Sequence, residues 1–115
     1  MAEKRGAAKA RNKAFALAPE VLVDNELSGR HTVLEVSGLD RPGLLFDLTH
    51  VISNLNLNIA SAHVATFGEK AVDVFYVTDL TGLKIVNPAR QGAIRRRLAE
   101  ALAAVPDKTP SKAGV

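Results

Sequence analysis

The hydrophobic pattern changes its period several times between residues 20 and 105, and this constrains the possible fold more than any other feature. Short runs of β-branched and apolar residues alternate with two stretches in which apolar residues recur every three or four positions. The first spacing is typical of strands and the second of amphipathic helices. The predicted order is strand, strand, helix, strand, strand, helix.

Turn and capping residues give approximate limits to these elements. Strands are expected at residues 20–24, 31–37, 59–66 and 71–78. The first helix is expected to follow the loop Gly38–Gly43, with Pro42 in its first turn, because the N–H that proline lacks would be unpaired there anyway. The second is expected to begin at Asn87-Pro88, with Asn87 as N-cap, and to stop at Pro106. The sequence therefore predicts an α+β two-layer sandwich, with two helices on one face of an antiparallel sheet.

The net charge of +3 and the isoelectric point near 9.5 raise the question of nucleic-acid binding. Residues 1–20 carry five Lys or Arg against two Glu, whereas residues 21–105 carry eight basic and nine acidic residues. A nucleic-acid domain carries its positive charge on a folded face, and an RNA-recognition fold needs stacking aromatics of the form Lys/Arg-Gly-Phe/Tyr-Gly/Ala-Phe on its central strands. The segment Lys70–Val74 does not fit that pattern, and the strand at 31–37 has no large aromatic residue. We expect flexible tails at 1–18 and 106–115, one domain at 19–105, and no nucleic-acid partner.

Signatures of catalysis and of metal binding are missing from the sequence. Cysteine is absent, no apolar run approaches the length of a membrane span, and the first residues do not resemble a signal peptide. His31, His50 and His63 do not have metal-ligand spacing, and helix-terminus electrostatics explains Asp40 and Asp47 better than a carboxylate pair does. We expect a cytoplasmic domain with no catalytic residue, no metal, no cofactor and no membrane contact.

The loop Gly38–Gly43 is the best candidate for a binding site. It joins a strand to the start of a helix, where backbone N–H groups lack partners and attract carboxylates. Its two glycines allow a ligand or another backbone to approach closely. A well-formed tight turn with no ligand explains the same residues, and physical reasoning alone leaves both interpretations open.

Two further patterns concern surfaces. The run Arg95–Arg97 is expected to face water, because its neighbours Ile94 and Leu98 belong to the apolar stripe of the second helix. In the strand Ala71–Thr78, both faces are mainly apolar. Two helices cover one face of a sheet, so we expect a partner on the sheet and self-association as a symmetric dimer.

Four segments together resemble the ACT domain family. They are His31–Leu45, Asn58-Ile59, Phe67–Asp79 and Asn87–Arg90. The resemblance covers residues 19–105 and implies a ferredoxin-like sandwich. An ACT domain usually ends in a strand, and residues 106–115 are too polar to supply one. We therefore expect the strand at 20–24 to pair with residues 31–37 and to take the vacant edge.

The resemblance also implies a ligand and its contacts. ACT domains of this type bind amino acids through the loop after the first family strand and the beginning of the next strand. The implied contact residues are Gly38, Leu39, Asp40, Arg41, Pro42, Gly43, Leu44, Asn58 and Ile59, with the last two expected beside the loop. Several amino-acid binders have Asn at the position of Asp40, whose charge suits an α-ammonium and repels an α-carboxylate.

The segments Phe67–Asp79 and Asn87–Arg90 are most similar to ACT domains that regulate a bacterial nitrogen-control enzyme, for which the implied ligand is glutamine. The implied partners are another ACT domain, as sister domain or second copy, and the catalytic domains of a parent enzyme. A module that dimerises and binds no ligand is the alternative that the sequence leaves open.

Overall fold

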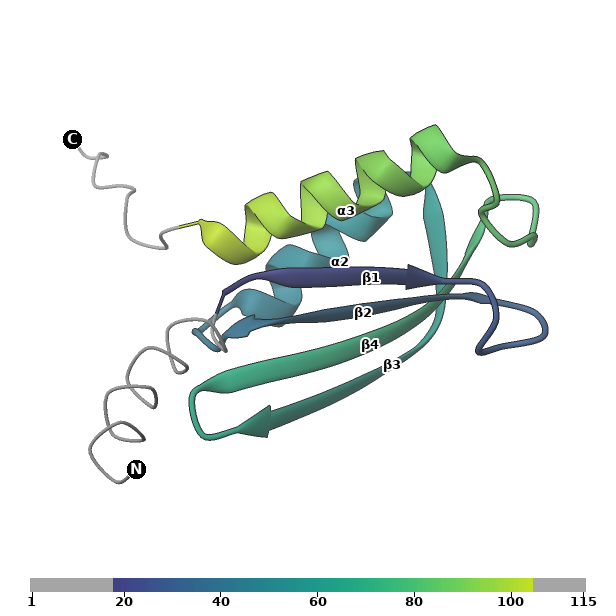
Figure 1. The fold of residues 1–115 in the computed structure, drawn as a ribbon. Coiled ribbons are helices and arrows are strands. Elements are labelled where there is room, and N and C mark those ends of the chain that lie inside the picture. Colours follow the sequence, from purple (N-terminus) through teal and green to yellow (C-terminus); the bar gives the residue numbers. More distant parts are fainter. Residues whose placement is uncertain (1–17, 105–115) are drawn as a thin grey trace, which may run out of the picture.

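The computed structural model describes residues 18–104, which form two layers (Figure 1). The strands are β1 (Glu20–Asp24), β2 (Thr32–Leu39), β3 (Leu57–Phe67) and β4 (Lys70–Asp79). The helices are α2 (Leu44–Asn54) and α3 (Pro88–Ala103), and both lie on the same face of the sheet. The predicted α+β sandwich is confirmed. The predicted tails at 1–18 and 106–115 fall, apart from residue 18, outside the described residues.

The sheet has the order β1-β2-β4-β3, and every neighbouring pair is antiparallel. β1 pairs with β2 from Glu20↔Ser37 to Asp24↔Val33. The N-terminal strand therefore takes the edge place that an ACT domain usually gives to its last strand, as predicted. β3 forms the opposite edge, and its side chains are exposed from Asn58 to Phe67.

Local chemistry explains where the helices begin and end. Asn87 caps α3, because its side chain accepts a hydrogen bond from Arg90 N–H at 2.9 Å, with Pro88 in the first position. α2 ends where Asn56 takes the left-handed conformation, with φ 61°, that asparagine tolerates after a helix. α3 ends at Ala103. The predicted stop at Pro106 lies outside the described residues.

The core fills the space between the helices and the sheet. Leu34 and Phe75 on the central strands are fully buried, as are Leu48 on α2 and Leu98 on α3. On β4 the buried positions alternate, so Ala71, Asp73, Phe75 and Val77 face the helices. Arg95–Arg97 is exposed, as predicted.

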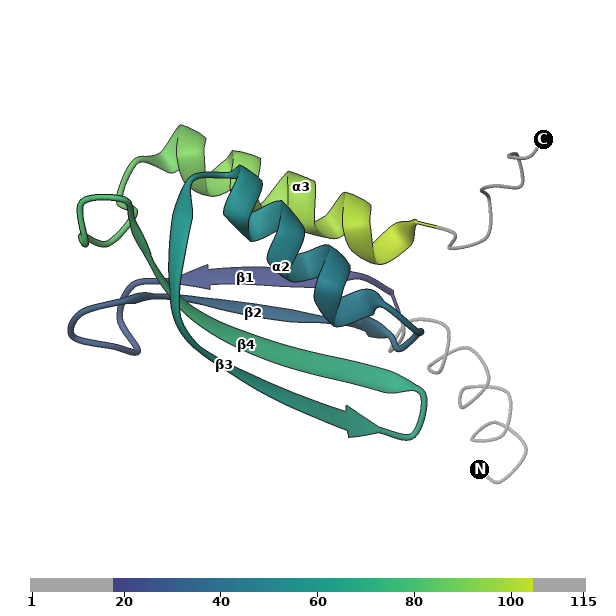
Figure 2. The ribbon, with the colours of Figure 1, turned by 180° about the vertical axis from the view of Figure 1, so that it is seen from behind.

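The connection from β2 to α2 and the turn from β3 to β4 lie at the same end of the molecule (Figure 2). The β3–β4 turn is formed by Gly68 and Glu69, and Gly68 supplies the positive φ, 64°, that a tight hairpin needs at its first position. The beginning of β3 lies at the other end (Figure 2). This arrangement determines which of the candidate residues are neighbours.

Candidate ligand-binding site

The candidate loop contains a tight turn immediately before α2. Leu44 N–H donates to Arg41 O at 3.2 Å, and Gly43 has φ 79° and ψ 1°. These are the features of a type II turn, with Pro42 at its second position and glycine at the third, where φ must be positive. α2 starts at Leu44, with Gly43 as N-cap. The expectation that Pro42 lies in the first helical turn is therefore wrong, because the type II turn uses Pro42 and delays the helix.

A backbone contact holds the loop against the hairpin. Asp40 N–H donates to Glu69 O at 2.8 Å, which extends the β2–β4 ladder by one bond beyond Leu39↔Lys70. The side chains of Leu39 and Asp40 are exposed beside this bond. Asp40 is thus fixed by its backbone while its carboxylate remains available to a ligand.

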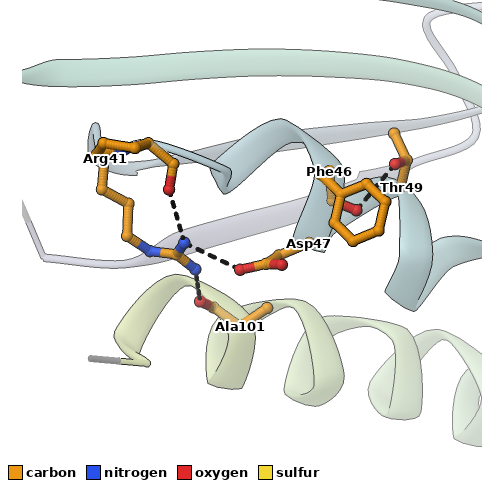
Figure 3. Close-up of polar contacts among 6 residues, drawn as sticks. Arg41, Phe46, Asp47, Thr49 and Ala101 are labelled. Carbon is orange, nitrogen blue, oxygen red and sulfur yellow. Dashed lines mark hydrogen bonds and ion pairs between the residues drawn. The ribbon is translucent and has the colours of Figure 1, made fainter. Parts of the chain in front are cut away.

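The side chain of Arg41 connects the loop to both helices (Figure 3). Its Nη1 lies 2.9 Å from Asp47 Oδ2 on α2, and its Nη2 donates to Ala101 O on α3 at 2.9 Å. Carbonyl oxygens in the last turn of a helix lack intrahelical partners and attract cations. This guanidinium therefore positions the loop in the structure, although the resemblance had implied that Arg41 contacts the ligand.

Gly38 is also needed for packing. A Cβ built on this residue would lie 3.3 Å from Leu102 Cδ2 on α3 and 3.8 Å from the Pro19 Cα. That spacing is tighter than nine in ten real Cβ contacts, so the Leu102 side chain would have to move by a few tenths of an ångström. By contrast, nothing lies within 4 Å of a Cβ built on Gly43, where the constraint comes from φ alone.

Two backbone donors at the start of α2 are free. Leu44 N–H is used by the turn and Asp47 N–H donates to Gly43 O at 3.0 Å. Within residues 18–104, the amides of Leu45 and Phe46 have no acceptor. Unpaired donors at a helix N-terminus, together with the helix dipole, favour a carboxylate or another small anion.

Asp73 is a further candidate residue, which the sequence motifs did not indicate. It is 2% exposed, faces the helices, and its Oδ1 is buried with no hydrogen-bond partner among the described residues. Burial raises the pKa of this carboxyl, and repulsion from Asp40 raises it further. The buried hydroxyl of Thr32, by comparison, donates to Asn25 Oδ1 and accepts from Ile85 N–H. The available signal was the alternation itself, which placed an acidic residue on the face shared with Phe75.

Asn58 and Ile59 do not lie beside the loop. Gly38 pairs with Ala71 on β4, whereas Asn58 pairs with Thr78, seven positions further along the same strand. At the rise of a strand, this separation is about 24 Å. One free amino acid cannot span it, so the two groups of implied contact residues cannot form one site within a single chain.

Residues 18–104 contain no group of three or more His, Cys, Asp or Glu side chains that could hold a metal ion. None of the helices in this part of the chain is long and apolar enough to cross a membrane. His31 and His63 instead contact the ring of Tyr76, at centroid distances of 6.1 and 5.6 Å.

The sheet order, the two helices on one face and the loop before α2 are those of a small ACT-like module. The chain belongs to this family, since the model described as "ACR9-like, ACT-like domain" matches residues 20–106. A crystal structure of an unknown protein from Galdieria sulphuraria has a TM-score of 0.51 and 24% identity, covering 65% of this chain and 40% of that chain. At that identity, the similarity shows the fold alone.

Among curated proteins, the chain is similar to bifunctional uridylyltransferase/uridylyl-removing enzymes. It is 65% identical over 100 residues to the enzyme of Nitrobacter hamburgensis, covering 87% of this chain and 11% of that protein. The enzyme of Rhodopseudomonas palustris is 65% identical over 95 residues, or 83% of this chain and 10% of that protein. That of Bradyrhizobium diazoefficiens is 59% identical over 99 residues, or 86% and 11%. The chain spans about a tenth of the length of these relatives.

Proposed function

We propose that this chain is the amino-acid-sensing module of a larger PII uridylyltransferase/uridylyl-removing enzyme, and that its ligand is glutamine. The observation that carries the proposal is the identity of 65% to about a tenth of such enzymes, within a chain that is an ACT-like domain. The ligand is the one that the family resemblance implies. A cytoplasmic location and contact with the catalytic domains of the parent enzyme are parts of the same proposal.

The chemistry of the loop supports a zwitterionic ligand. A free amino acid requires donors for its carboxylate and acceptors for its ammonium. The free amides of Leu45 and Phe46 provide donors, and the exposed carboxylate of Asp40 provides an acceptor. In this orientation the ligand's carboxylate faces the helix start and its ammonium faces Asp40. The negative charge of Asp40 then attracts the ammonium and lies away from the carboxylate that it would repel.

The distance between the loop and Asn58 favours a composite site. Since about 24 Å of strand separates them in one chain, we assign the loop to one ACT domain and Asn58-Ile59 to another. The second domain is a sister domain in the longer protein or a second copy of this chain. A ligand held by two domains can stabilise one of their arrangements, and uridylyl transfer and removal then respond to differential affinity.

An NMR titration of the chain with glutamine tests this proposal, with serine and phenylalanine as control ligands. The expected result is a set of shifts at residues 38–46 and 58–59 that glutamine alone produces. Half a site makes only part of the contacts, so we expect weak affinity, near a millimolar Kd or about −4 kcal/mol. An unchanged spectrum in a sample shown to be dimeric would contradict the proposal.

The second candidate is a module that associates with other ACT domains and binds no ligand. The observation that favours it is the exposed β3 edge, which carries no Lys, Arg, Asp or Glu from Leu57 to Phe67. Uncharged strand edges readily pair with other chains. Dimerisation without any glutamine-dependent shift would select this alternative.

A further inference from the structure

We propose that Asp73 anchors the ammonium group of the amino-acid ligand, beneath the loop that joins β2 to α2. This inference rests on the proposed function and adds to it a residue on β4 that belongs to neither of the implied contact segments. It also defines the ligand class: a primary ammonium close to a carboxylate, as in an α-amino acid.

The position of Asp73 is suitable. It lies two residues from Ala71, which pairs with Gly38, so it is about 7 Å along β4 from the beginning of the loop. It faces the helix layer rather than the open face of the sheet. Asp40 lies close enough to affect its ionisation. Both carboxylates therefore belong to the half of the sheet that leads into the loop, with Asp40 four residues beyond Val36, which pairs with Asp73.

The state of the Asp73 carboxylate indicates that a partner is missing. A buried charge is normally paired or fully hydrogen-bonded, because its desolvation is costly. Here Oδ1 has no partner within residues 18–104, and Asp40 adds repulsion. A cation placed between the two carboxylates supplies hydrogen bonds to Oδ1 and removes that repulsion.

An ammonium is a better candidate than a metal ion. The described residues offer no third acidic or imidazole ligand at this place, and divalent cations need several. An ammonium carries one charge and three donors, which matches two carboxylates with little else around them.

The free amides complete the match. Leu45 and Phe46 N–H, at the start of α2, suit a carboxylate, while Asp40 and Asp73 suit an ammonium. Both charged groups of an α-amino acid are attached to the same α-carbon. The loop end thus provides acceptors and donors for the invariant part of the ligand, and leaves its side chain to the second domain.

The test compares two ligands on three forms of the chain. The ligands are glutamine and glutaramate, which is glutamine without its α-ammonium. The variants are Asp73→Asn and the matched control Glu35→Gln. Glu35 pairs with Val74, the residue that follows Asp73 on β4, and its side chain lies on the other face of the sheet from Asp73. The control therefore removes one negative charge at nearly the same position along the strands. Kd values are measured by NMR titration, and the fold of each variant is checked from its spectrum.

Wild type and Glu35→Gln should both bind glutamine more tightly than glutaramate, by about tenfold or more, the usual effect of a charged hydrogen bond. Asp73→Asn should lose this preference and bind both ligands with similar affinity. The wild type provides a second test if Asp73→Asn does not fold: glutamine, but not glutaramate, should shift the side-chain carboxyl carbon resonance of Asp73.

Retention of the full preference by a folded Asp73→Asn variant would overturn the inference, and glutamine binding by the wild type would still support the proposed function. If the variant does not fold, an Asp73 carboxyl resonance that glutamine does not shift in the wild type would have the same meaning. No binding of glutamine to a dimeric wild-type sample would overturn both.

Discussion

At the scale of single residues, similar sequence signals have different structural origins. Gly38 and Gly43 were both expected to allow close approach of a ligand, but Gly38 makes room for Leu102 and Gly43 supplies a positive φ. Arg41 was assigned to the ligand, and its guanidinium binds Asp47 and the end of α3. Sequence could not show this, because Ala101 lies 60 positions from Arg41 and meets it only in the fold.

Asp73→Asn should change how stability depends on pH. Because burial and Asp40 raise the pKa of Asp73, the folded protein holds this proton more tightly than the unfolded chain. The stability that this tighter proton binding provides is therefore fully present below the unfolded pKa of about 3.9. It is lost as the pH rises through the raised pKa of the folded state. Asparagine does not titrate, so the variant should gain stability relative to wild type as the pH increases.

Urea unfolding of wild type, Asp73→Asn and Glu35→Gln between pH 4 and 8 measures this effect. The control loses a carboxylate from the opposite face of the sheet and shows what the loss of one charge does by itself. A difference between wild type and Asp73→Asn that stays constant across this range would show that the carboxyl is not perturbed by folding.

Gly43→Ala should destabilise the chain by about 1–2 kcal/mol, the cost of a left-handed conformation for a residue with a Cβ. This cost comes from the φ of 79° and not from a clash, since nothing lies within 4 Å of the added Cβ. Gly29→Ala is the matched control, because Gly29 has equal space and no positive φ. Equal unfolding free energies for the two variants in urea would mean that the turn before α2 relaxes.

At the scale of elements, the sequence predicted every strand and helix of residues 18–104, and the observed limits of the strands differ from the predicted ones by at most two residues. A nearly continuous run of apolar and β-branched residues identifies strands such as β4 well, because both of its faces are mainly apolar. The position of Pro42 was wrong, since a type II turn and a first helical turn both favour proline. The local sequence Arg-Pro-Gly fits the turn, and glycine after proline was the signal for it.

Leu98→Ala should cost about 2–5 kcal/mol of unfolding free energy. Leu98 is fully buried on the face of α3 that packs against the core, so the substitution leaves a cavity. Leu83→Ala removes the same atoms from a side chain that is 65% exposed, and should have little effect. Thermal or urea unfolding of both variants measures the difference, and similar stabilities would contradict the assigned packing.

At the scale of the whole molecule, the fold was predictable and the composite site was not. Family resemblance placed Asn58 and Ile59 next to the loop, but the strand register puts them at the opposite end of β4. A sequence of 115 residues gives no information on which chain completes a site. The uncharged β3 edge provides a physical route, because antiparallel pairing of two β3 strands places Leu57 of one copy near Phe67 of the other.

We expect the chain to form a symmetric dimer through its β3 edges. Such pairing brings Asn58-Ile59 of one copy to the β3–β4 turn of its partner, and that turn is bonded to the loop through Asp40 N–H and Glu69 O. The two groups of residues would then be separated by about three strand spacings, or about 14 Å, rather than by about 24 Å along one chain, and would approach each other twice in each dimer. Sedimentation equilibrium at high micromolar concentration should give the dimer mass.

Val64→Lys should weaken this dimer, because a lysine on an exposed edge strand opposes pairing, and Val64 is 54% exposed on β3. Val86→Lys adds the same charge to a side chain that is 73% exposed outside the strands, and should leave the dimer mass unchanged. Glutamine binding is measured in Ala65→Lys instead, because Val64 pairs with Asp73 and a lysine there would act on the proposed anchor directly, whereas Ala65 is exposed and pairs with Val72 on the other face. If the site is composite, Ala65→Lys should weaken glutamine binding, while Val86→Lys should not. A monomeric wild type, or equal association of the two variants, would exclude the β3 edge as the interface.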